Sequence, residues 1–305
     1  MRLVTYRAAA ASEGRLGVVH GDLVVDVERL GASIGLPFPL TMLDLIDQGP
    51  DALAAVDRAL KDTDGKRAPG LAVPVQNVKM LAPIPRPRKN IFGIGLNYVE
   101  HVAESARTLD TSKDLPTKPV VFSKPPTAVI ADGEPIQHNA AMTQQLDWEV
   151  ELAVIIGKRA TRISKADAMS HVFGYSVIND VSARDNRRAG QWIFSKGQDS
   201  YCPFGPAIVT ADEIADPHNL DLWLRKNGEE KQRSNTRHLL FDIPTLIADI
   251  SSGMTLEPGD IIATGTPAGV GAGRDPQEWM WPGAVIECGV DGIGILRNPG
   301  GKIGE

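Results

Sequence analysis

Two glutamates with a single residue between them form the strongest chemical pattern in the chain. Glu149 and Glu151 stand at the start of an apolar run that ends at Gly157, and such a run is typical of a buried strand. Because side chains alternate along a strand, both carboxylates point to one face. Neighbouring carboxylates at a core repel each other and resist dehydration, and a hard divalent cation relieves both costs. The alternative at this point is a solvated pair on an edge strand.

Three further residues have the chemistry to complete such a centre. Asp180 ends an apolar strand predicted over 172–180, where a carboxylate is well placed as a third oxygen ligand. Arg184 follows four residues later and would face the same way on a helical turn, or would form an ordinary salt bridge there. Lys196 comes directly after an apolar run, and a lysine near a bound carbonyl can stabilise a developing oxyanion.

A histidine and a glutamate three residues apart supply a candidate base. His101 and Glu104 share a face of a short predicted helix, for which Asn97 is the expected cap. A carboxylate beside an imidazole raises its basicity and fixes its tautomer, which suits a base acting on water. The alternative is an exposed pair that only supports the helix. The polar stretch 105–117 is consistent with a lid or with a surface loop.

Two other stretches suit anions. The backbone N–H groups and hydroxyls of Thr264, Gly265 and Thr266 form a tight loop that could bind a carboxylate. Lys124 precedes two prolines and either faces an anion or lies exposed. Cys202 has no base near it in the sequence, so we interpret it as structural.

Composition narrows the class of protein. Of the 305 residues 42% are hydrophobic and 23% charged, which is ordinary for a globular protein. A net charge of −6 argues against nucleic acid as the main partner. The two cysteines form no disulfide framework and no zinc-binding pair, so a cytoplasmic location is expected. No run approaches the length of a membrane span, and no signal peptide is expected.

The pattern of elements predicts two domains. Residues 1–75 are expected to form a small α+β domain, with a hairpin over 17–27 and helices split at Gly49-Pro50. A polar stretch over 62–70 is the expected linker. Residues 76–305 are expected to form the catalytic domain, including a helix over 164–171, a hairpin over 221–231 and a helix over 243–250.

Taken together and in order, these blocks resemble the fumarylacetoacetate hydrolase family from about residue 83 to 297. The resemblance implies an α+β, mostly β fold, a mixed β-sandwich roll of that family's type, commonly dimeric. The matching blocks are Gly95-Leu96-Asn97-Tyr98 with His101 and Glu104, Asp147-Trp148-Glu149-Val150-Glu151-Leu152, Asn179-Asp180-Val181-Ser182-Ala183-Arg184-Asp185, Phe194-Ser195-Lys196, and Thr264-Gly265-Thr266-Pro267.

The resemblance also implies roles for individual residues. The family's ligands for Mg2+ or Mn2+ correspond to Glu149, Glu151 and Asp180. Its water-activating dyad corresponds to His101 and Glu104, and its lysine beside the substrate carbonyl to Lys196. Its two substrate contacts correspond to Arg184 and Thr266. One departure stands out. Many members carry a substrate-contacting glutamine about three residues after this arginine, whereas Arg187 and Arg188 stand there, and they could favour an extra carboxylate.

The expected function is divalent-metal-dependent hydrolysis of a C–C bond in an acylpyruvate or related β-diketo acid, such as fumarylpyruvate, with release of pyruvate. This would place the protein in the catabolism of aromatic compounds, as a homodimer acting on a small 2-oxo acid. Isomerisation or decarboxylation of a 2-oxo-enoic diacid, or a lyase reaction, stays open because all begin from the same enolate chemistry. A non-catalytic metabolite-binding protein is the second alternative.

Overall fold

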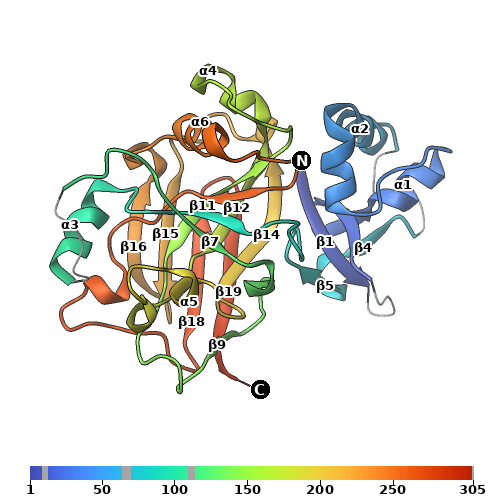
Figure 1. Cartoon of the computed structure of the whole chain (residues 1–305). Helices are drawn as coiled ribbons and strands as arrows, with labels where there is room; N and C mark the ends of the chain where they lie inside the picture. The colour runs from blue at the N-terminus through green and yellow to red at the C-terminus, as the bar shows by residue number, and fades with distance from the viewer. Residues whose placement is uncertain (9–12, 64–69, 109–113, 304–305) are drawn as a thin grey trace.

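The computed structural model describes residues 1–8, 13–63, 70–108 and 114–303. Its N-terminal part joins five strands at one end of the large sheet to two helices (Figure 1). The predicted hairpin is confirmed, since β2 and β3 pair antiparallel around the Gly21-Asp22 turn. The helix α2 bends at Gly49, whose φ is 76°, which confirms the predicted break. The elements are β1 (Arg2–Ala8), β2 (Arg15–His20), β3 (Leu23–Asp26), α1 (Val27–Ser33), α2 (Met42–Asp62), β4 (Ala72–Pro74) and β5 (Val78–Leu81).

The large sheet runs through both halves of the chain. Strand β1 pairs with β14 as well as with β2 and β5, so the strand order is β4-β3-β2-β1-β14-β12-β11-β17-β6-β7. The domain division at residue 75 therefore stays a prediction, and most of the linker expected at 62–70 lies outside the described residues. The further strands are β6 (Ile91–Gly95), β7 (Val120–Lys124), β8 (Val129–Ile130), β11 (Val150–Ile156), β12 (Val172–Asn179), β14 (Cys202–Thr210) and β17 (Ile261–Ala263).

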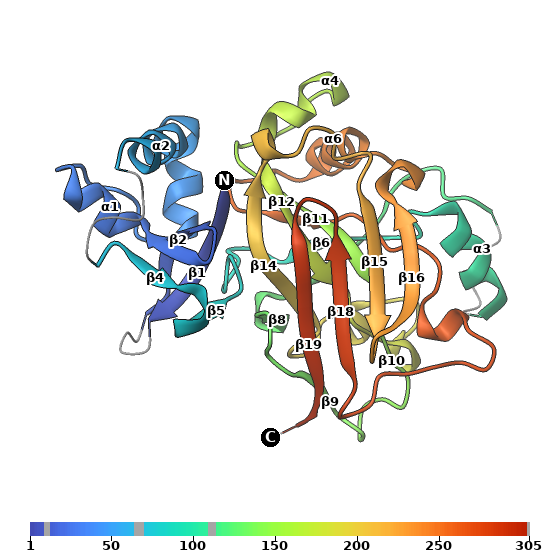
Figure 2. The same cartoon turned by 180° about the vertical axis from the view of Figure 1, so that it is seen from behind.

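A second sheet packs over the centre of the first (Figure 2), with β14 against β19 and β12 against β18. Its order is β16-β15-β18-β19-β9. The predicted hairpin at 221–231 is confirmed, since β15 and β16 meet at Asn227-Gly228. The remaining elements are β9 (Ile136–His138), β10 (Leu146–Asp147), α4 (Lys165–Ala168), β13 (Ser182–Ala183), α5 (Ile193–Lys196), β15 (Asp221–Lys226), β16 (Glu229–Asn235), α6 (Ile243–Gly253), β18 (Val285–Val290) and β19 (Gly294–Lys302). The two helices expected near 164–171 and 243–250 correspond to α4, continued by a 3-10 turn, and α6.

Strand β11 shows how the fold positions the acidic residues. Its even-numbered residues, such as Leu152 and Val154, are fully buried in the core between the two sheets. Its odd-numbered residues Ala153 and Ile155 face the opposite side, in a second core that includes α2. Glu151 has the same parity, so its side chain leaves the sheet on that opposite face. The mixed-sheet, mostly β fold expected from the sequence is confirmed, and none of the described helices is long and apolar enough to cross a membrane.

Asp26 stabilises the N-terminal elements and provides a test of their stability. Its buried carboxylate accepts hydrogen bonds from the Tyr6 hydroxyl at 2.5 Å, from Arg15 Nε at 2.6 Å and from the backbone N–H of Arg29 at 2.9 Å. Burial alone would raise the pKa of Asp26, but the bonds from Arg15 and Tyr6 lower it below its ordinary value. The stability that Asp26 contributes is therefore present above the ordinary carboxyl pKa and lost as the pH falls through the lowered one.

We expect Asp26→Asn to lower the free energy of unfolding by about 2–3 kcal/mol at pH 7, because charge-assisted bonds to a buried carboxylate are lost. Urea unfolding at pH 7 and below pH 4 measures the effect. The difference in unfolding free energy between wild type and variant should be smaller below pH 4 than at pH 7. An equal difference at both pH values would contradict the role of the ionised carboxylate.

A buried three-carboxylate centre and its pocket

Pairing of β11 with β12 brings three carboxylates together. Val150 pairs with Asn179, so the residue after β12, Asp180, lies beside Glu149, and its N–H donates to the Glu149 carbonyl at 2.8 Å. Ligand oxygens of Glu149, Glu151 and Asp180 all lie within 4.8 Å of one another, and all three residues are buried. The predicted alternation of Glu149 and Glu151, together with the observed pairing of β11 and β12, therefore assembles the expected oxygen cluster.

Three cations lie among these acids. Lys196 Nζ bridges Glu149 at 2.7 Å and Asp180 at 2.5 Å, and Arg184 donates to Glu149 at 2.5 Å. Lys124 is fully buried and bonds the other oxygen of Asp180 at 2.5 Å, so of its two predicted environments the one facing an anion is confirmed.

Asp147 adds a fourth buried carboxylate, which is joined to the cluster through Arg184. It bonds Arg184 Nε at 2.8 Å and accepts the N–H groups of Gly271 and Ala272. Among the residues that the structure describes, these four buried carboxyl groups thus face three cations, one fewer than the acids. Arg184 does not pair with Asp180, as a helical turn would have required; it joins Asp147 to Glu149 instead.

Glu151 is the one of these four carboxyl groups that bonds none of the three cations. Burial, then the neighbouring charges of Asp180 and Glu149, raise the pKa of Glu151 well above its usual value. For Glu149 burial acts in the same direction, but Lys196 and Arg184 outweigh it and hold its pKa far below the usual range. Among the described residues, Glu151 Oε1 has no hydrogen-bond partner although it is buried. An orphaned carboxylate oxygen beside two more carboxylates fits a hard divalent cation such as Mg2+ or Mn2+.

The Thr264–Thr266 loop binds a carboxylate, but one that belongs to the protein. The Gly265 N–H donates to Glu151 Oε2 at 2.8 Å, and Gly265 adopts a φ of 103° that favours glycine. The Thr266 hydroxyl donates to the Val150 carbonyl at 2.9 Å and faces the pocket. The loop therefore fixes one oxygen of Glu151 and leaves the other directed at the cluster.

The histidine dyad forms on α3 (Val99–Thr108), as predicted. His101 Nδ1 lies 3.1 Å from Glu104 Oε2, and both side chains are buried. The other oxygen of Glu104 accepts the Gly269 N–H at 2.9 Å, which ties α3 to the loop after β17. Because Glu104 occupies Nδ1, His101 Nε2 is the atom available to the pocket side, with Ser105 Oγ at 3.4 Å.

Asn97 does not act as the expected helix cap. Its amide donates to the carbonyls of Thr264 and Phe241, and its oxygen accepts the Phe241 N–H at 2.8 Å. The residue instead joins β6 to two distant loops, because its buried side chain reaches backbone groups that need partners. Of the stretch 105–117, expected to be a lid or surface loop, residues 105–108 belong to α3 and 109–113 lie outside the described residues.

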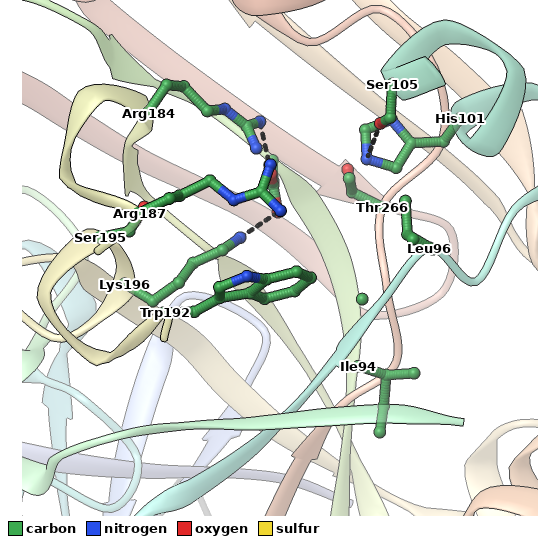
Figure 3. Close-up of a pocket in the computed structure, with 12 residues that line it drawn as sticks. Ile94, Leu96, His101, Ser105, Arg184, Arg187, Trp192, Ser195, Lys196 and Thr266 are labelled. Atoms are coloured by element: carbon green, nitrogen blue, oxygen red, sulfur yellow. Dashed lines mark hydrogen bonds and ion pairs between the residues drawn. The ribbon is translucent and has the colours of Figure 1, made fainter. Parts of the chain in front are cut away.

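One pocket opens onto these groups (Figure 3). Arg184, Arg187, Trp192 and Lys196 line one side, and His101 stands on the other. Glu149 lines the same pocket, so the carboxylate cluster is accessible from it.

The structure brings the eight predicted site residues into one connected group. Five line the pocket, and the other three are bonded to or clustered with those five. The five are His101, Glu149, Arg184, Lys196 and Thr266, and the three are Glu104, Glu151 and Asp180. Their individual roles stay predictions.

The sequence missed two supporting residues. Asp147 orients Arg184, and Gln232 bonds both the Val150 N–H and the Thr266 hydroxyl. Asp147 stood in a matching block without an assigned role, and Gln232 gave no signal, because it comes from the second sheet.

Comparison with known proteins identifies the family. Residues 90–299, more than half of the chain, match the family described as fumarylacetoacetate (FAA) hydrolase, C-terminal. The chain therefore belongs to the fumarylacetoacetate hydrolase family, as the resemblance predicted.

Similar proteins carry several activities. A mitochondrial oxaloacetate tautomerase of Bos taurus is 40% identical over 98% of this chain and 91% of its own length. The oxaloacetate tautomerase YisK of Bacillus subtilis (strain 168) is 46% identical over 73% of each chain. Among solved structures, maleylpyruvate hydrolase from Sphingobium sp. SYK-6, in complex with manganese(II) ion and pyruvate, is 32% identical with a TM-score of 0.77 over 99% of both chains. These names support metal-dependent chemistry of the family type but not hydrolysis in particular.

Proposed function

We propose that this protein is a divalent-metal-dependent oxaloacetate tautomerase, which converts the enol and keto forms of a 2-oxo acid. The observation that carries this is the buried cluster of Glu149, Glu151 and Asp180, with its orphaned Glu151 oxygen, opening onto a pocket with His101 on the opposite side. Two relatives with substantial identity bear the same activity in their names.

The three carboxylates would hold Mg2+ or Mn2+, which when bound supplies Lewis-acid polarisation of a 2-oxo acid. Tautomerisation removes the proton from the enol oxygen and adds one to carbon 3. Lys196, which lies between Glu149 and Asp180, would place its positive charge beside the enol oxygen of the substrate. His101 Nε2, held in one orientation by Glu104, carries the proton to or from carbon 3.

An assay of the disappearance of enol oxaloacetate, followed by its ultraviolet absorbance, tests this proposal. Purified protein with Mn2+ should accelerate the conversion, and EDTA should abolish the acceleration. Conversion at the rate of buffer with Mn2+ alone would contradict the proposal.

We expect His101→Gln to lower kcat for tautomerisation by about 10²–10⁴-fold, because a positioned proton carrier contributes that much. KM should change far less, since His101 is not among the proposed metal-binding groups. His171→Gln is the matched control, because His171 is a half-exposed histidine that contacts the Lys158 carbonyl. Unchanged kcat in His101→Gln would contradict its role.

Hydrolysis of an acylpyruvate is the second candidate, and the dyad of His101 and Glu104 is the observation that favours it. In that reaction His101 would take a proton from water, which attacks the distal carbonyl. A coupled assay for pyruvate across acylpyruvates and fumarylpyruvate separates the two, since tautomerisation releases none. A homodimer stays a prediction, which light scattering can test.

A further inference from the structure

The loop after β17 holds the carboxylate that orients His101. The backbone N–H of Gly269 donates to Glu104 Oε1 at 2.9 Å, and Glu104 Oε2 lies 3.1 Å from His101 Nδ1. Four residues further along the loop, Gly273 meets the same side chain. A Cβ atom built at Gly273 would overlap it, since the three nearest heavy atoms are Cγ, Cδ and Oε1 of Glu104. The Glu104 carboxylate therefore lies in space that only a glycine at position 273 leaves open.

The backbone of Gly273 does not itself require a glycine. Its φ lies outside the left-handed region, unlike the φ of 102° at Gly269. Gly273 ends the 3-10 turn η7 (Gly271–Gly273), which packs against α3 and is orange-red beside it in Figure 1. A larger residue at this position is thus excluded by the Glu104 side chain and not by the local conformation.

The turn is held in place independently of Glu104. The N–H of Gly271 donates to the buried Asp147 at 2.6 Å, and the Gly271 carbonyl accepts the N–H of Glu278 at 3.0 Å. A Cβ at Gly271 would overlap the Glu278 backbone, so the turn is closely packed on that side as well. A methyl group added at position 273 would therefore displace the flexible Glu104 side chain and not the turn.

We propose that Gly273 is a positioning residue for His101 and acts by leaving room for the Glu104 carboxylate. The proposal rests on the function proposed above, in which His101 Nε2 carries a proton to or from the substrate. With Oε1 bonded to the Gly269 N–H and the carboxylate against Gly273, Oε2 stays at His101 Nδ1. The imidazole then keeps Nε2 toward the pocket, across from Lys196 (Figure 3). A reacting group misplaced by about 1 Å can lose about 100-fold in rate.

Gly273→Ala should lower kcat for enol oxaloacetate about 100-fold, because the added methyl displaces Glu104 from His101. KM and the Kd for Mn2+ should each change less than about threefold, since the atoms nearest the methyl belong to Glu104 and not to a proposed metal ligand. Gly253→Ala is the matched control, because Gly253 ends α6 and a Cβ added there points into open space. The kcat of this control should equal that of wild type.

A double-mutant cycle separates positioning of His101 from a general packing role of Gly273. Glu104→Ala removes the three atoms that the new methyl would overlap. If Gly273 acts through Glu104, adding Gly273→Ala to Glu104→Ala should lower kcat by less than about twofold more. A further loss of about 100-fold in that background would overturn the inference.

Proton nuclear magnetic resonance gives a readout that does not depend on activity. The Nδ1 proton that His101 donates to Glu104 should give a downfield signal, assigned by its loss in His101→Gln. The signal should move upfield in Gly273→Ala and stay in place in Gly253→Ala. An unmoved signal in Gly273→Ala would overturn the inference. So would a Gly273→Ala protein that thermal melting shows to be unfolded, since the side chain and not the fold is expected to yield.

Failure of the proposed function is distinguishable from failure of this inference. If wild type with Mn2+ converts no enol oxaloacetate, the tautomerase proposal falls. The resonance of the Nδ1 proton then decides alone whether Gly273 positions the pair of His101 and Glu104.

Discussion

The substitution Glu151→Gln will leave the metal-free protein at least as stable as wild type, but will make the metal-loaded protein less stable than wild type. In the metal-free protein the Glu151 carboxylate is buried, clustered with Glu149 and Asp180, and has no cationic partner among the described residues. Because burial and the charges of Asp180 and Glu149 raise the pKa of Glu151, a neutral glutamine suits this environment at least as well, so the free energy of unfolding of the metal-free variant should equal or exceed that of wild type.

With Mn2+ bound, the free energy of unfolding of wild type should exceed that of the variant. At a free Mn2+ concentration about 100 times its Kd, wild type should gain about 2.7 kcal/mol of unfolding free energy from mass action. Glu151→Gln removes a proposed ligand and should gain little, and its activity should fall at least about 10³-fold. Urea unfolding with and without Mn2+ measures both states. A variant that still gains as much as wild type would show that Glu151 is not a ligand.

Lys124→Met will lower the free energy of unfolding by about 3–5 kcal/mol, the usual cost of leaving one member of a buried ion pair behind. Lys124 is fully buried, donates to Asp180 at 2.5 Å and to the Val181 carbonyl at 3.2 Å, and does not line the pocket. Because it fixes the oxygen of Asp180 that turns away from Lys196, its loss should also weaken Mn2+ binding about 10–100-fold.

Lys165→Met is the matched control for that variant. Lys165 also pairs with an aspartate, Asp242 at 3.2 Å, but the two side chains are about half exposed. An exposed pair contributes about 0–1 kcal/mol, so this change should be nearly neutral. Titration calorimetry with Mn2+ and urea unfolding test both variants. Equal effects of the two substitutions would contradict the special role of the buried pair.

The sequence predicted the acidic centre because local rules govern it. Strand alternation places Glu149 and Glu151 on one face, and an apolar strand ending in Asp180 marks a carboxylate at a strand terminus. The order of the blocks then indicated the family and hence the mostly β fold. The same local logic predicted the hairpins and the bend of α2 at Gly49.

What the sequence could not supply depends on contacts between distant segments. Lys124 and Asp180 are 56 residues apart, and Gln232 reaches Val150 from the second sheet, so no periodicity links them. Asn97 looked like a helix cap because caps are recognised locally, whereas its true partners are at Phe241 and Thr264. The finer choice between tautomerase and hydrolase depends on how the substrate lies, which strand patterns do not encode.

The central claim is that Glu149, Glu151 and Asp180 hold one divalent cation at the floor of the pocket. Anomalous diffraction from a crystal of the Mn2+-loaded protein, measured at the manganese edge, tests it most directly. We predict one strong peak with an oxygen of each of these residues at about 2.0–2.3 Å. A crystal with no peak among the three carboxylates, or with a peak elsewhere, would contradict the account.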